Sequence, residues 1–204
     1  MFNLLKQINP AKDYHHYRWF FTSNNTLVVG GKSDNQNEIA LKNFLHPKYT
    51  VLHTSKPGSP FMIIISDNPT KKEIEETAIF TACFSKQWKE SKPSSKIGID
   101  LFKGEQIYKA KEMKKGTFGI KGKKQTLKVK PELTLIIQKG KIRAVPRIDK
   151  KNKLIQTLAE IKPGKLSKEQ AAEKIAKIIK DKFQLPVSKD EIMQAIPSDK
   201  LSVR

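Results

Sequence analysis

The first third of the chain alternates short apolar runs with polar turns. Residues 18–22 and 26–29 are β-prone and flank two consecutive asparagines, which tolerate the positive φ that a tight hairpin requires. Two more runs follow at 49–53 and 61–65. The second of these is wholly apolar, which is typical of a strand buried on both faces. The pattern therefore predicts four strands in this part of the chain.

Helices are predicted where a capping pair precedes apolar positions at helical spacing. Four such pairs occur: Ser33 with Gln36, Thr70 with Glu73, Ser167 with Gln170, and Ser188 with Glu191. The second pair opens the segment 70–91, which is apolar over most of its surface and ends before Pro93, so we expect the longest core helix there. Cys83 lies inside this segment and is predicted to be a small core residue, not a nucleophile.

After residue 100 the apolar runs return as short β-like segments. The expected strands are 106–108, 117–120, 126–129, 133–138, 142–145 and 153–161, of which the first four form a meander. Together with the core helix they predict an α+β fold: a mixed or antiparallel sheet packed against a central helix, with a small C-terminal helical appendage. We place the core unit at 1–145 and the appendage at 146–204. Residues 1–12 are interpreted as either a docking arm or a loosely ordered lead.

Charge adds the strongest functional indication. The 204 residues carry 40 Lys and Arg against 20 Asp and Glu, a formal net charge of +20. The excess is uneven, because residues 103–153 hold 17 basic and 4 acidic residues. A field of this size favours polyanions, so nucleic acid is the predicted partner. The alternative, a merely solvated surface, does not require such one-sidedness.

Other classes of function find little support in the residues. Cys83 is the sole cysteine, which excludes an internal disulfide and a zinc-cysteine cluster, and the four histidines are too scattered for a metal motif. We therefore expect no metal and no cofactor. No apolar run approaches the ~20 residues of a membrane span, and the N-terminus lacks a signal pattern, so a cytoplasmic protein without membrane contact is predicted. The oligomeric state is left open.

Residues 114–124, here called the lysine loop, have the sequence Lys-Lys-Gly-Thr-Phe-Gly-Ile-Lys-Gly-Lys-Lys. Its three glycines leave the backbone open to close approach, and its five lysines supply positive charge. The spacing is that of neither a Walker loop nor a dinucleotide-binding fingerprint. The loop is instead suited to the sugar-phosphate backbone of a nucleic acid.

Two further turns are candidates for phosphate contact. Gly30-Gly31-Lys32 directly precedes a predicted helix, and the amides at a helix N-terminus bind anions. The alternative is that these glycines only turn the chain. His53 precedes the rigid turn 54–60, which contains Lys56, Gly58 and Ser59. Because no nucleophile and carboxylate accompany this histidine, loop orientation or phosphate contact is favoured over catalysis.

These motifs resemble the NFACT-R domain of the NFACT family of ribosome-quality-control factors. The similar segments are Tyr17-Arg-Trp-Phe20, Gly30-Gly31, Asn37-Glu38, the turn from His53 to Pro60, the helical run 77–88 and, most specifically, residues 116–124. Thr117 and Lys121 stand where the family pattern has Ser and Arg. The segments after residue 162 are similar, more loosely, to the C-terminal part of archaeal-type NFACT proteins.

The resemblance implies an RNA-binding domain from proteins that recognise obstructed large ribosomal subunits. In their full-length forms these proteins also recruit tRNA for untemplated C-terminal tailing. The chain is too short for their NFACT-N domain, helix-hairpin-helix and long coiled coil, so a free-standing relative is expected. The partner implied is rRNA or tRNA, and which RNA is bound is left open.

The main hypothesis is therefore a non-catalytic RNA-binding module acting in translation. Its candidate RNA contacts are Tyr17, Arg18, Trp19, Gly30, Gly31, Lys32, His53, Lys56, Gly58, Ser59, Lys114, Lys115, Lys121, Gly122, Lys123, Lys124, Lys139, Lys141 and Arg143. The two aromatic residues among them would stack on bases if exposed, and otherwise pack in the core. One alternative is an enzyme acting on RNA or nucleotide, with His53 and either Asp34 or Glu38 as an acid–base pair. The other is a basic adaptor for an acidic protein.

Overall fold

The computed structural model describes residues 14–146 and 156–204, and its larger sheet has six strands. Their order is β1 (Arg18–Phe21), β2 (Leu27–Gly30), β4 (Met62–Ile64), β3 (Thr50–Thr54), β5 (Ile97–Lys103) and β8 (Gln125–Val129), with every neighbouring pair antiparallel. β1 and β2 form the predicted hairpin, and its turn contains Asn25 at φ 62°. The arm expected at 1–12 lies outside the described residues.

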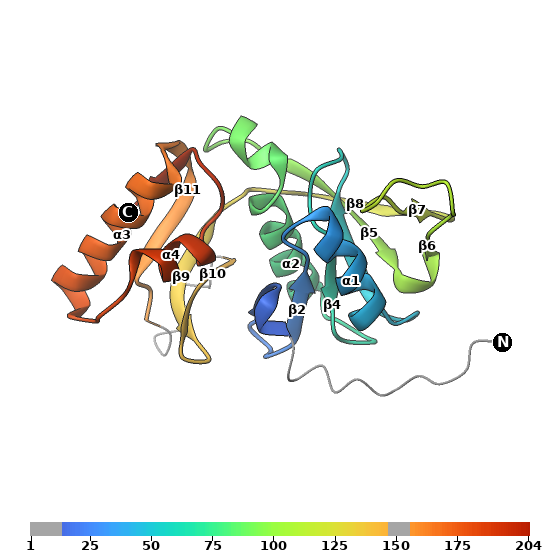
Figure 1. The fold of residues 1–204 in the computed structure, drawn as a ribbon, viewed down its shortest axis with the longest axis horizontal. Coiled ribbons are helices and arrows are strands. Elements are labelled where there is room, and N and C mark those ends of the chain that lie inside the picture. Colours follow the sequence, from blue (N-terminus) through green and yellow to red (C-terminus); the bar gives the residue numbers. More distant parts are fainter. Residues whose placement is uncertain (1–13, 147–155) are drawn as a thin grey trace.

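A second, four-stranded sheet is also antiparallel. Its order is β10 (Lys141–Pro146), β9 (Leu133–Gln138), β11 (Ala159–Leu166) and β12 (Leu201–Val203). Helices α3 (Lys168–Phe183) and α4 (Lys189–Ala195) pack on this sheet, on the left of Figure 1. A separate small hairpin pairs β6 (Ile107–Tyr108) with β7 (Gly119–Ile120).

Helix α2 (Lys71–Cys83) lies between the two sheets and contacts strands of both (Figure 1). Most of its buried positions are small or compact: Thr77, Ala78, Thr81, Ala82 and Cys83. The hydroxyls of Thr77 and Thr81 donate to carbonyls four residues earlier, at 2.8 and 2.7 Å, so both buried groups are satisfied. One apolar core therefore extends from the first sheet through α2 to the second sheet and α3.

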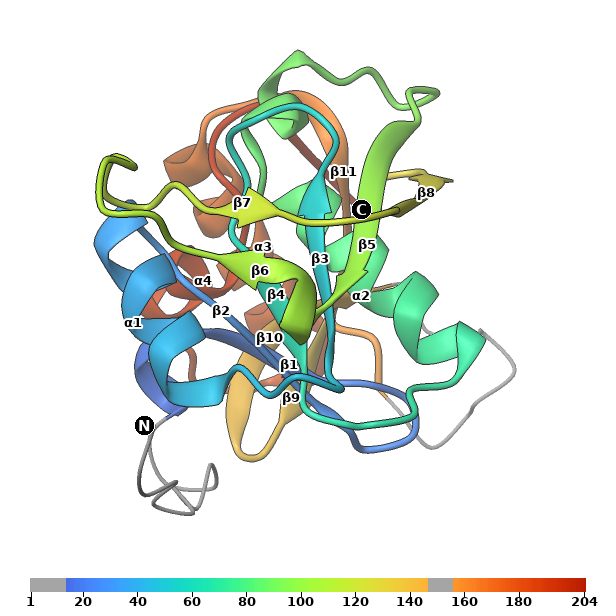
Figure 2. The ribbon, with the colours of Figure 1, turned by 90° about the vertical axis from the view of Figure 1, so that its right-hand side faces the viewer.

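The opposite face of the six-stranded sheet is covered by α1 (Asp34–Phe44) and the β6–β7 hairpin (Figure 2). A second core forms there, in which Trp19, Phe61 and Phe102 of the sheet side meet Leu41 and Phe44 of α1. The sheet is thus buried on both faces. This confirms the prediction for the apolar run 61–65, since all of β4 is buried.

The predicted capping pairs mark where each helix begins. Those of α2 and α3 form reciprocal capping boxes. The other two cap in one direction only. The Ser188 hydroxyl accepts from the Glu191 amide at 3.1 Å, whereas the Glu191 carboxylate accepts from the Ile142 amide of β10 at 3.1 Å. Likewise, the Gln36 side chain accepts from the amide of Lys32 at 2.9 Å.

The helix expected at 70–91 is shorter than predicted. α2 ends at Cys83, and a 3-10 turn follows at Lys86–Glu90. The backbone amide of Lys86 donates to the carbonyl of Gly58, in the turn between β3 and β4, at 2.7 Å. This bond takes the place of the one that would continue the α-helix. Cys83 is buried, and burial raises the pKa of its thiol, which fits the predicted core role.

The meander expected at 106–138 is wrong, because its strands belong to three different sheets. β6 and β7 pair with each other, β8 lies beside β5, and β9 joins the second sheet. Strands β5 and β12 were not predicted. The strand expected at 153–161 starts at Ala159 in the described residues and runs past Pro163. This proline lies beyond the part of β11 that pairs with β9, where its missing N–H removes no bond to that strand.

The α+β class, the antiparallel sheets and the C-terminal helical part are confirmed. The second sheet combines β9 and β10, which precede residue 147, with β11 and β12, which follow residue 155. Strands from both sides of the expected division at 145 and 146 therefore share one sheet. The division itself stays a prediction.

Enlarging α2 should destabilise the protein, since the helix is enclosed by two sheets. Ala78 is fully buried, and Ala78→Leu forces additional carbon atoms between the sheets. We expect a loss of about 1–3 kcal/mol in the free energy of unfolding, measured by chemical denaturation. Glu75→Leu, at an exposed position of the same helix, is the control and should change it little. An equally small effect at both positions would contradict tight packing.

Glu73 should make stability depend on acid pH. Burial raises the pKa of its carboxyl, but hydrogen bonds from Thr26, Thr70 and Asn24 outweigh this and lower it to about 2. A pKa depressed in the folded state contributes stability that is present above the unfolded value of 4.5 and lost as the pH falls toward 2. Denaturation curves of Glu73→Gln should therefore show a shallower decline than wild type over this interval. Glu75→Gln should follow the wild type.

Candidate nucleic-acid interface

The start of the lysine loop is held against α1 by two charged side chains. Lys109 Nζ donates to a Glu38 carboxylate oxygen at 2.7 Å and to the carbonyls of Lys114 and Thr117 at 2.7 and 3.0 Å. The same Glu38 oxygen accepts the amide of Gly116 at 2.7 Å. These bonds fix the backbone of the loop and leave its leading lysine side chains exposed.

The end of the loop is held by Gln106. The side-chain amide of Gln106 donates to the backbone carbonyls of Lys121 and Lys123 at 2.8 and 2.9 Å. The backbone carbonyl of Gln106 accepts the backbone amide of Lys121 at 2.8 Å. Both lysine side chains are exposed, and Lys121 Nζ lies 5.0 Å from the ring centre of Tyr108. The backbone is again fixed without neutralising the lysines.

The three glycines of the loop differ in what surrounds them. Gly116 and Gly122 both have φ 77°, which favours glycine. A Cβ on Gly116 would lie 2.5 Å from the Asp34 side chain, and one on Gly119 would lie 2.2 Å from the ring of Tyr108. The close approach predicted for a ligand is therefore made by the protein itself at these two positions. Gly122 is the least crowded of the three, because a Cβ there would meet only Gln106 Nε2, at 3.4 Å.

Lys124 is the least available lysine of the loop. Its Nζ lies 2.5 Å from the carboxylate of Asp100, which is 5% exposed and also accepts from Ser55 and Thr126 at 2.7 Å each. Burial raises the pKa of Asp100, but the hydrogen bonds from these three side chains outweigh burial and hold the pKa below its ordinary value. The carboxylate is therefore charged. Lys124 therefore ties the loop to the β5–β8 pair.

His53 is not arranged as half of an acid–base pair with the expected carboxylates. Its ring lies 4.6 Å from that of Phe61, and burial lowers its pKa. Among the described residues, the carboxylate that acts on it is Asp100, and no hydrogen bond or ion pair joins it to Asp34 or Glu38. The pairing proposed for catalysis is therefore not formed in this structure.

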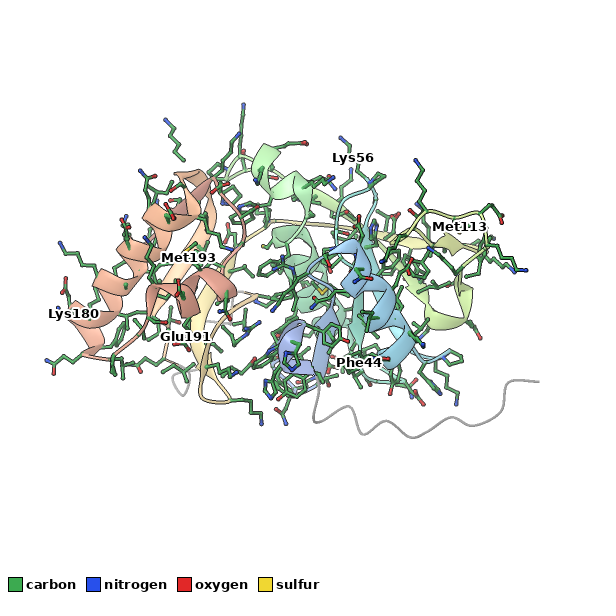
Figure 3. The ribbon with its side chains drawn as sticks, in the orientation of Figure 1. Phe44, Lys56, Met113, Lys180, Glu191 and Met193 are labelled. Carbon is green, nitrogen blue, oxygen red and sulfur yellow. The ribbon has the colours of Figure 1, made fainter. Side chains whose placement is uncertain are left out.

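The turn after His53 exposes fewer candidate groups than expected. The Ser59 hydroxyl is buried and accepts the amide of Thr54 at 2.9 Å, and the Thr54 hydroxyl donates to the carbonyl of Lys56 at 2.6 Å. Gly58 adopts φ 111° and lies against the side chain of Lys86. The Lys56 side chain extends from the turn into solvent, at the top of Figure 3.

Gly30 and Gly31 serve close packing. A Cβ on Gly30 would lie 2.3 Å from the sulfur of Met62, and one on Gly31 would lie 2.5 Å from the amide nitrogen of Asn37. Close packing is thus a reason for both glycines that the sequence analysis did not consider, and the anion contact predicted there stays a prediction. Lys32, the next residue, has an exposed side chain.

Tyr17 and Trp19 pack in the core, as expected for the case in which they are not exposed. They are 7% and 1% exposed, and the Tyr17 ring packs edge-on against Phe44 with 5.2 Å between ring centres. Core packing explains both. Tyr108, 38% exposed and next to the lysine loop, is an accessible aromatic that the sequence analysis did not single out.

The remaining candidates gather where β1 meets β10. Arg143 Nη2 donates to the carbonyl of Trp19 at 2.8 Å, and its guanidinium carbon lies 4.3 Å from the centre of that ring. The turn before β10 adds the exposed Lys139, whose Nζ lies 5.1 Å from the ring centre of Phe21, and the exposed Lys141. Arg18 lies on β1 itself. The structure thus divides the predicted basic residues into two main groups, the lysine loop and this junction.

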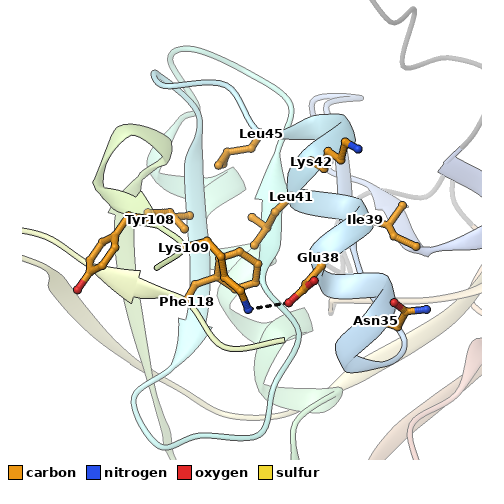
Figure 4. Close-up of a pocket in the computed structure, with 10 residues that line it drawn as sticks. Asn35, Glu38, Ile39, Leu41, Lys42, Leu45, Tyr108, Lys109 and Phe118 are labelled. Atoms are coloured by element: carbon orange, nitrogen blue, oxygen red, sulfur yellow. Dashed lines mark hydrogen bonds and ion pairs between the residues drawn. The ribbon is translucent and has the colours of Figure 1, made fainter. Parts of the chain in front are cut away.

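A pocket of about 460 Å³ lies between α1 and the β6–β7 hairpin, beside the lysine loop (Figure 4). Leu41, Leu45 and Phe118 line it with apolar atoms, and the Glu38–Lys109 ion pair lies at its side. It is therefore an apolar hollow next to a positively charged surface.

Within 14–146 and 156–204, no three metal-ligating side chains come together. No helix in the same ranges has the length and apolar character needed to cross a membrane.

The residues that fix the lysine loop were missed by the sequence analysis. Gln106 and Lys109 act on the loop from the β6 side of its own hairpin, whereas Glu38 and Asp100 act from elements that the chain's local pattern does not connect to it. Glu38 and Gly116, for example, are 78 residues apart. No signal of spacing or periodicity reports such contacts.

Comparison with known proteins identifies relatives in ribosome quality control. "Archaeal Rqc2 homolog aRqcH" of Methanocaldococcus jannaschii is 27% identical over 200 residues, which cover 91% of this chain and 28% of that protein. "Ribosome quality control complex subunit NEMF" of Homo sapiens is 31% identical over 80 residues, covering 37% of this chain and 7% of that protein. The Drosophila melanogaster homolog of NEMF is 35% identical over 69 residues, which cover 34% of this chain and 7% of that protein. The chain thus spans less than a third of these relatives.

A solved structure has a similar fold. It is the C-terminal part of the fibronectin/fibrinogen-binding protein from Streptococcus suis, with a TM-score of 0.51 and 19% identity. The similarity covers 57% of this chain and 46% of that one.

Residues 16–122, just over half of the chain, match the family of the NFACT protein RNA binding domain. The matched range holds β1 to β7, α1, α2 and most of the lysine loop. The resemblance seen in the sequence is confirmed, and the chain belongs to the NFACT-R family.

Proposed function

We propose that this protein is a non-catalytic RNA-binding module that acts on rRNA or tRNA in ribosome-associated quality control, at the large ribosomal subunit. The observation that carries the proposal is the lysine loop. Its backbone is held by hydrogen bonds with three side chains outside the loop, those of Lys109, Glu38 and Gln106, while most of its lysine side chains stay exposed. A loop that is ordered before binding loses less conformational entropy when RNA binds.

The charges of the loop suit phosphate groups. Lys114, Lys115, Lys121 and Lys123 make no ion pair within the described residues, in contrast to Lys124. Binding of a polyanion to such groups releases counterions, and this release supplies much of the affinity. Contacts of this kind position RNA without reading its sequence.

Tyr108 gives the same surface a place for a base. Its exposed ring lies under Lys121 and borders the apolar pocket beside α1. Bases stack on exposed aromatic rings in a manner that tolerates any sequence. Tyr108 thus takes the stacking role first considered for Tyr17 and Trp19.

The names of the relatives favour ribosome quality control over an unrelated RNA pathway. The archaeal relative is similar over 91% of this chain. Because the chain spans only 28% of that protein, we assign to this chain only RNA binding in the process and none of the relative's other activities. An adaptor for an acidic protein would keep its partner after nuclease treatment, whereas the RNA module would release it.

Removing the free lysines of the loop should weaken RNA binding. In the variant Lys114→Ala, Lys121→Ala, Lys123→Ala, we expect affinity to fall about tenfold or more, with a salt slope shallower by up to about one unit per lost phosphate contact. The fold should be retained, because exposed charges contribute little to stability. Filter binding of rRNA and tRNA over a salt series measures both quantities. A flat dependence of wild-type binding on salt would contradict the electrostatic account.

The matched control is Lys174→Ala, Lys177→Ala, Lys180→Ala on α3, which removes the same charge from exposed positions. Figure 3 shows Lys180 at the opposite end of the molecule from Met113, which directly precedes the lysine loop. We expect a smaller loss of affinity in this control. Equal losses would indicate a diffuse positive field without a defined site.

The role of loop order is tested by Glu38→Ala. This change makes the protein more positive, so a diffuse field would bind RNA more tightly. It also removes the acceptor of Lys109 and of the Gly116 amide, so a preorganised loop would bind more weakly. We expect weaker binding in filter assays and faster amide exchange at Gly116. Glu75→Ala on α2, with the same charge change, should not weaken binding.

A further inference from the structure

The two sheets meet edge to edge at β1 and β10 without pairing as strands. The side chain of Gln138 accepts the amide of Phe21 at 2.8 Å and donates to its carbonyl at 2.9 Å. Arg143 donates to the carbonyl of Trp19 at 2.8 Å. These side chains satisfy backbone groups that an edge strand would otherwise leave free.

Five cationic side chains lie near enough to this contact for their charges to act on one another, here called the junction cluster: Arg18, Lys32, Lys141, Arg143 and Lys168. Burial lowers the pKa of Arg18 to about 10. The pKa of Arg143 is also lowered to about 10, first by burial and second by the charge of Arg18. The pKa of Lys32 is lowered by burial and by both arginines, and that of Lys168 by burial and by Arg18. The members of the cluster therefore repel one another.

No carboxylate compensates either arginine within the described residues. The guanidiniums instead lie over aromatic rings, that of Arg18 4.5 Å from the centre of Phe84. Among the described residues, Asp199 acts on the cluster by raising the pKa of Lys168. Its carboxylate already accepts the backbone amide of Lys168 at 3.0 Å and lies 3.4 Å from Lys89 Nζ. Two half-buried positive charges thus have no counterion in the part of the chain that the structure describes.

The structural role of Arg143 does not account for its charge. Gln138 satisfies the same edge strand as a neutral side chain. Furthermore, the Nε of Arg143 is buried and has no hydrogen-bond partner. A donor of this kind normally finds an acceptor, and this nitrogen has none among the described residues.

We propose that Arg18 and Arg143 bind a phosphate group of the RNA at this junction, with the three lysines of the cluster around it. The inference rests on the proposed function and adds a second, specific site to it. Planar guanidiniums suit phosphate because they offer parallel N–H donors. Three of the five cations, Lys141, Arg143 and Lys168, come from the second sheet and α3. The second sheet and α3 would therefore both contribute to the RNA site, α3 through Lys168.

The junction cluster and the lysine loop lie on one continuous path. Lys32 stands at the start of α1 and belongs electrostatically to the cluster. Asp34, two residues further, lies against Gly116 of the lysine loop. RNA that follows the loop can therefore reach the junction across the N-terminal end of α1.

The experiment compares three single variants with the wild type in filter binding over a salt series. Arg143→Gln keeps a neutral donor for the edge strand and removes the charge. Lys168→Ala removes a charge without touching that strand. Gln138→Ala breaks the junction's neutral contact and leaves every charge in place. We expect Arg143→Gln to weaken RNA binding about tenfold or more, Lys168→Ala to weaken it less, and both to lower the salt slope by about one unit.

Gln138→Ala should lower the Tm and leave RNA affinity at lower temperature unchanged. Wild-type affinity in both Arg143→Gln and Lys168→Ala would overturn the proposal, while leaving RNA binding by the lysine loop in place. A loss in Gln138→Ala equal to that in Arg143→Gln would also overturn it, because junction geometry and not charge would then explain the effect.

Inorganic phosphate separates this site from the proposed function. At constant ionic strength, replacing chloride with phosphate should raise the Tm of the wild type more than that of Arg143→Gln, since ligand binds the folded state. Equal shifts would count against the site even if RNA binds. If the wild type bound no RNA, the proposed function would fail, whereas a phosphate shift that depends on Arg143 would still support an anion site here.

Discussion

The burial of α2 between two sheets is the constraint on which the rest of this structure depends. A helix normally buries one stripe and leaves the opposite face to water, but α2 contacts a sheet on either side. Small side chains such as Ala78 and Ala82 make this possible, because larger ones would hold the sheets apart. The hydroxyls of Thr77 and Thr81 bond within the helix and so add no unsatisfied group to the core. Both sheets pack on this helix, and the apolar core that extends across the two sheets follows from it.

Packing two sheets on one helix brings an edge of each sheet together. The edges of β1 and β10 are not joined by a ladder of strand pairs, so side chains must satisfy the backbone groups that face the junction. Gln138 meets this need with a neutral amide, whereas Arg143 brings a charge next to Arg18. Stability alone does not favour two such charges without a counterion. The same contact that joins the two sheets therefore also concentrates positive charge on the surface that RNA would reach.

The parts of the fold that depend on neighbouring residues could be predicted from the sequence. Capping pairs located the helix starts, the asparagine turn located the first hairpin, and the apolar run at 61–65 indicated a strand buried on both faces. Strand neighbours could not be predicted, because β8 and β9 are close in sequence yet belong to different sheets. β5 was missed although Ile97, Ile99 and Leu101 alternate with Gly98 and Asp100, which is the period of a strand. In the candidate site, the charge of the lysine loop could be predicted, but the pairing of Lys124 with Asp100 is a long-range contact without a local signal.

The few carboxylates near the basic surface explain how a chain of net charge +20 can present an ordered site. Like charges repel, so a lysine-rich loop in water tends to spread over many conformations. Glu38 opposes this by bonding both Lys109 and the Gly116 amide, and Asp100 does so by holding Lys124. Neither carboxylate pairs with Lys114, Lys121 or Lys123. The acidic side chains thus order the backbone while the exposed cations remain uncompensated. Such a surface combines an ordered backbone with uncompensated charge, which is what the proposed binding of RNA phosphates would use.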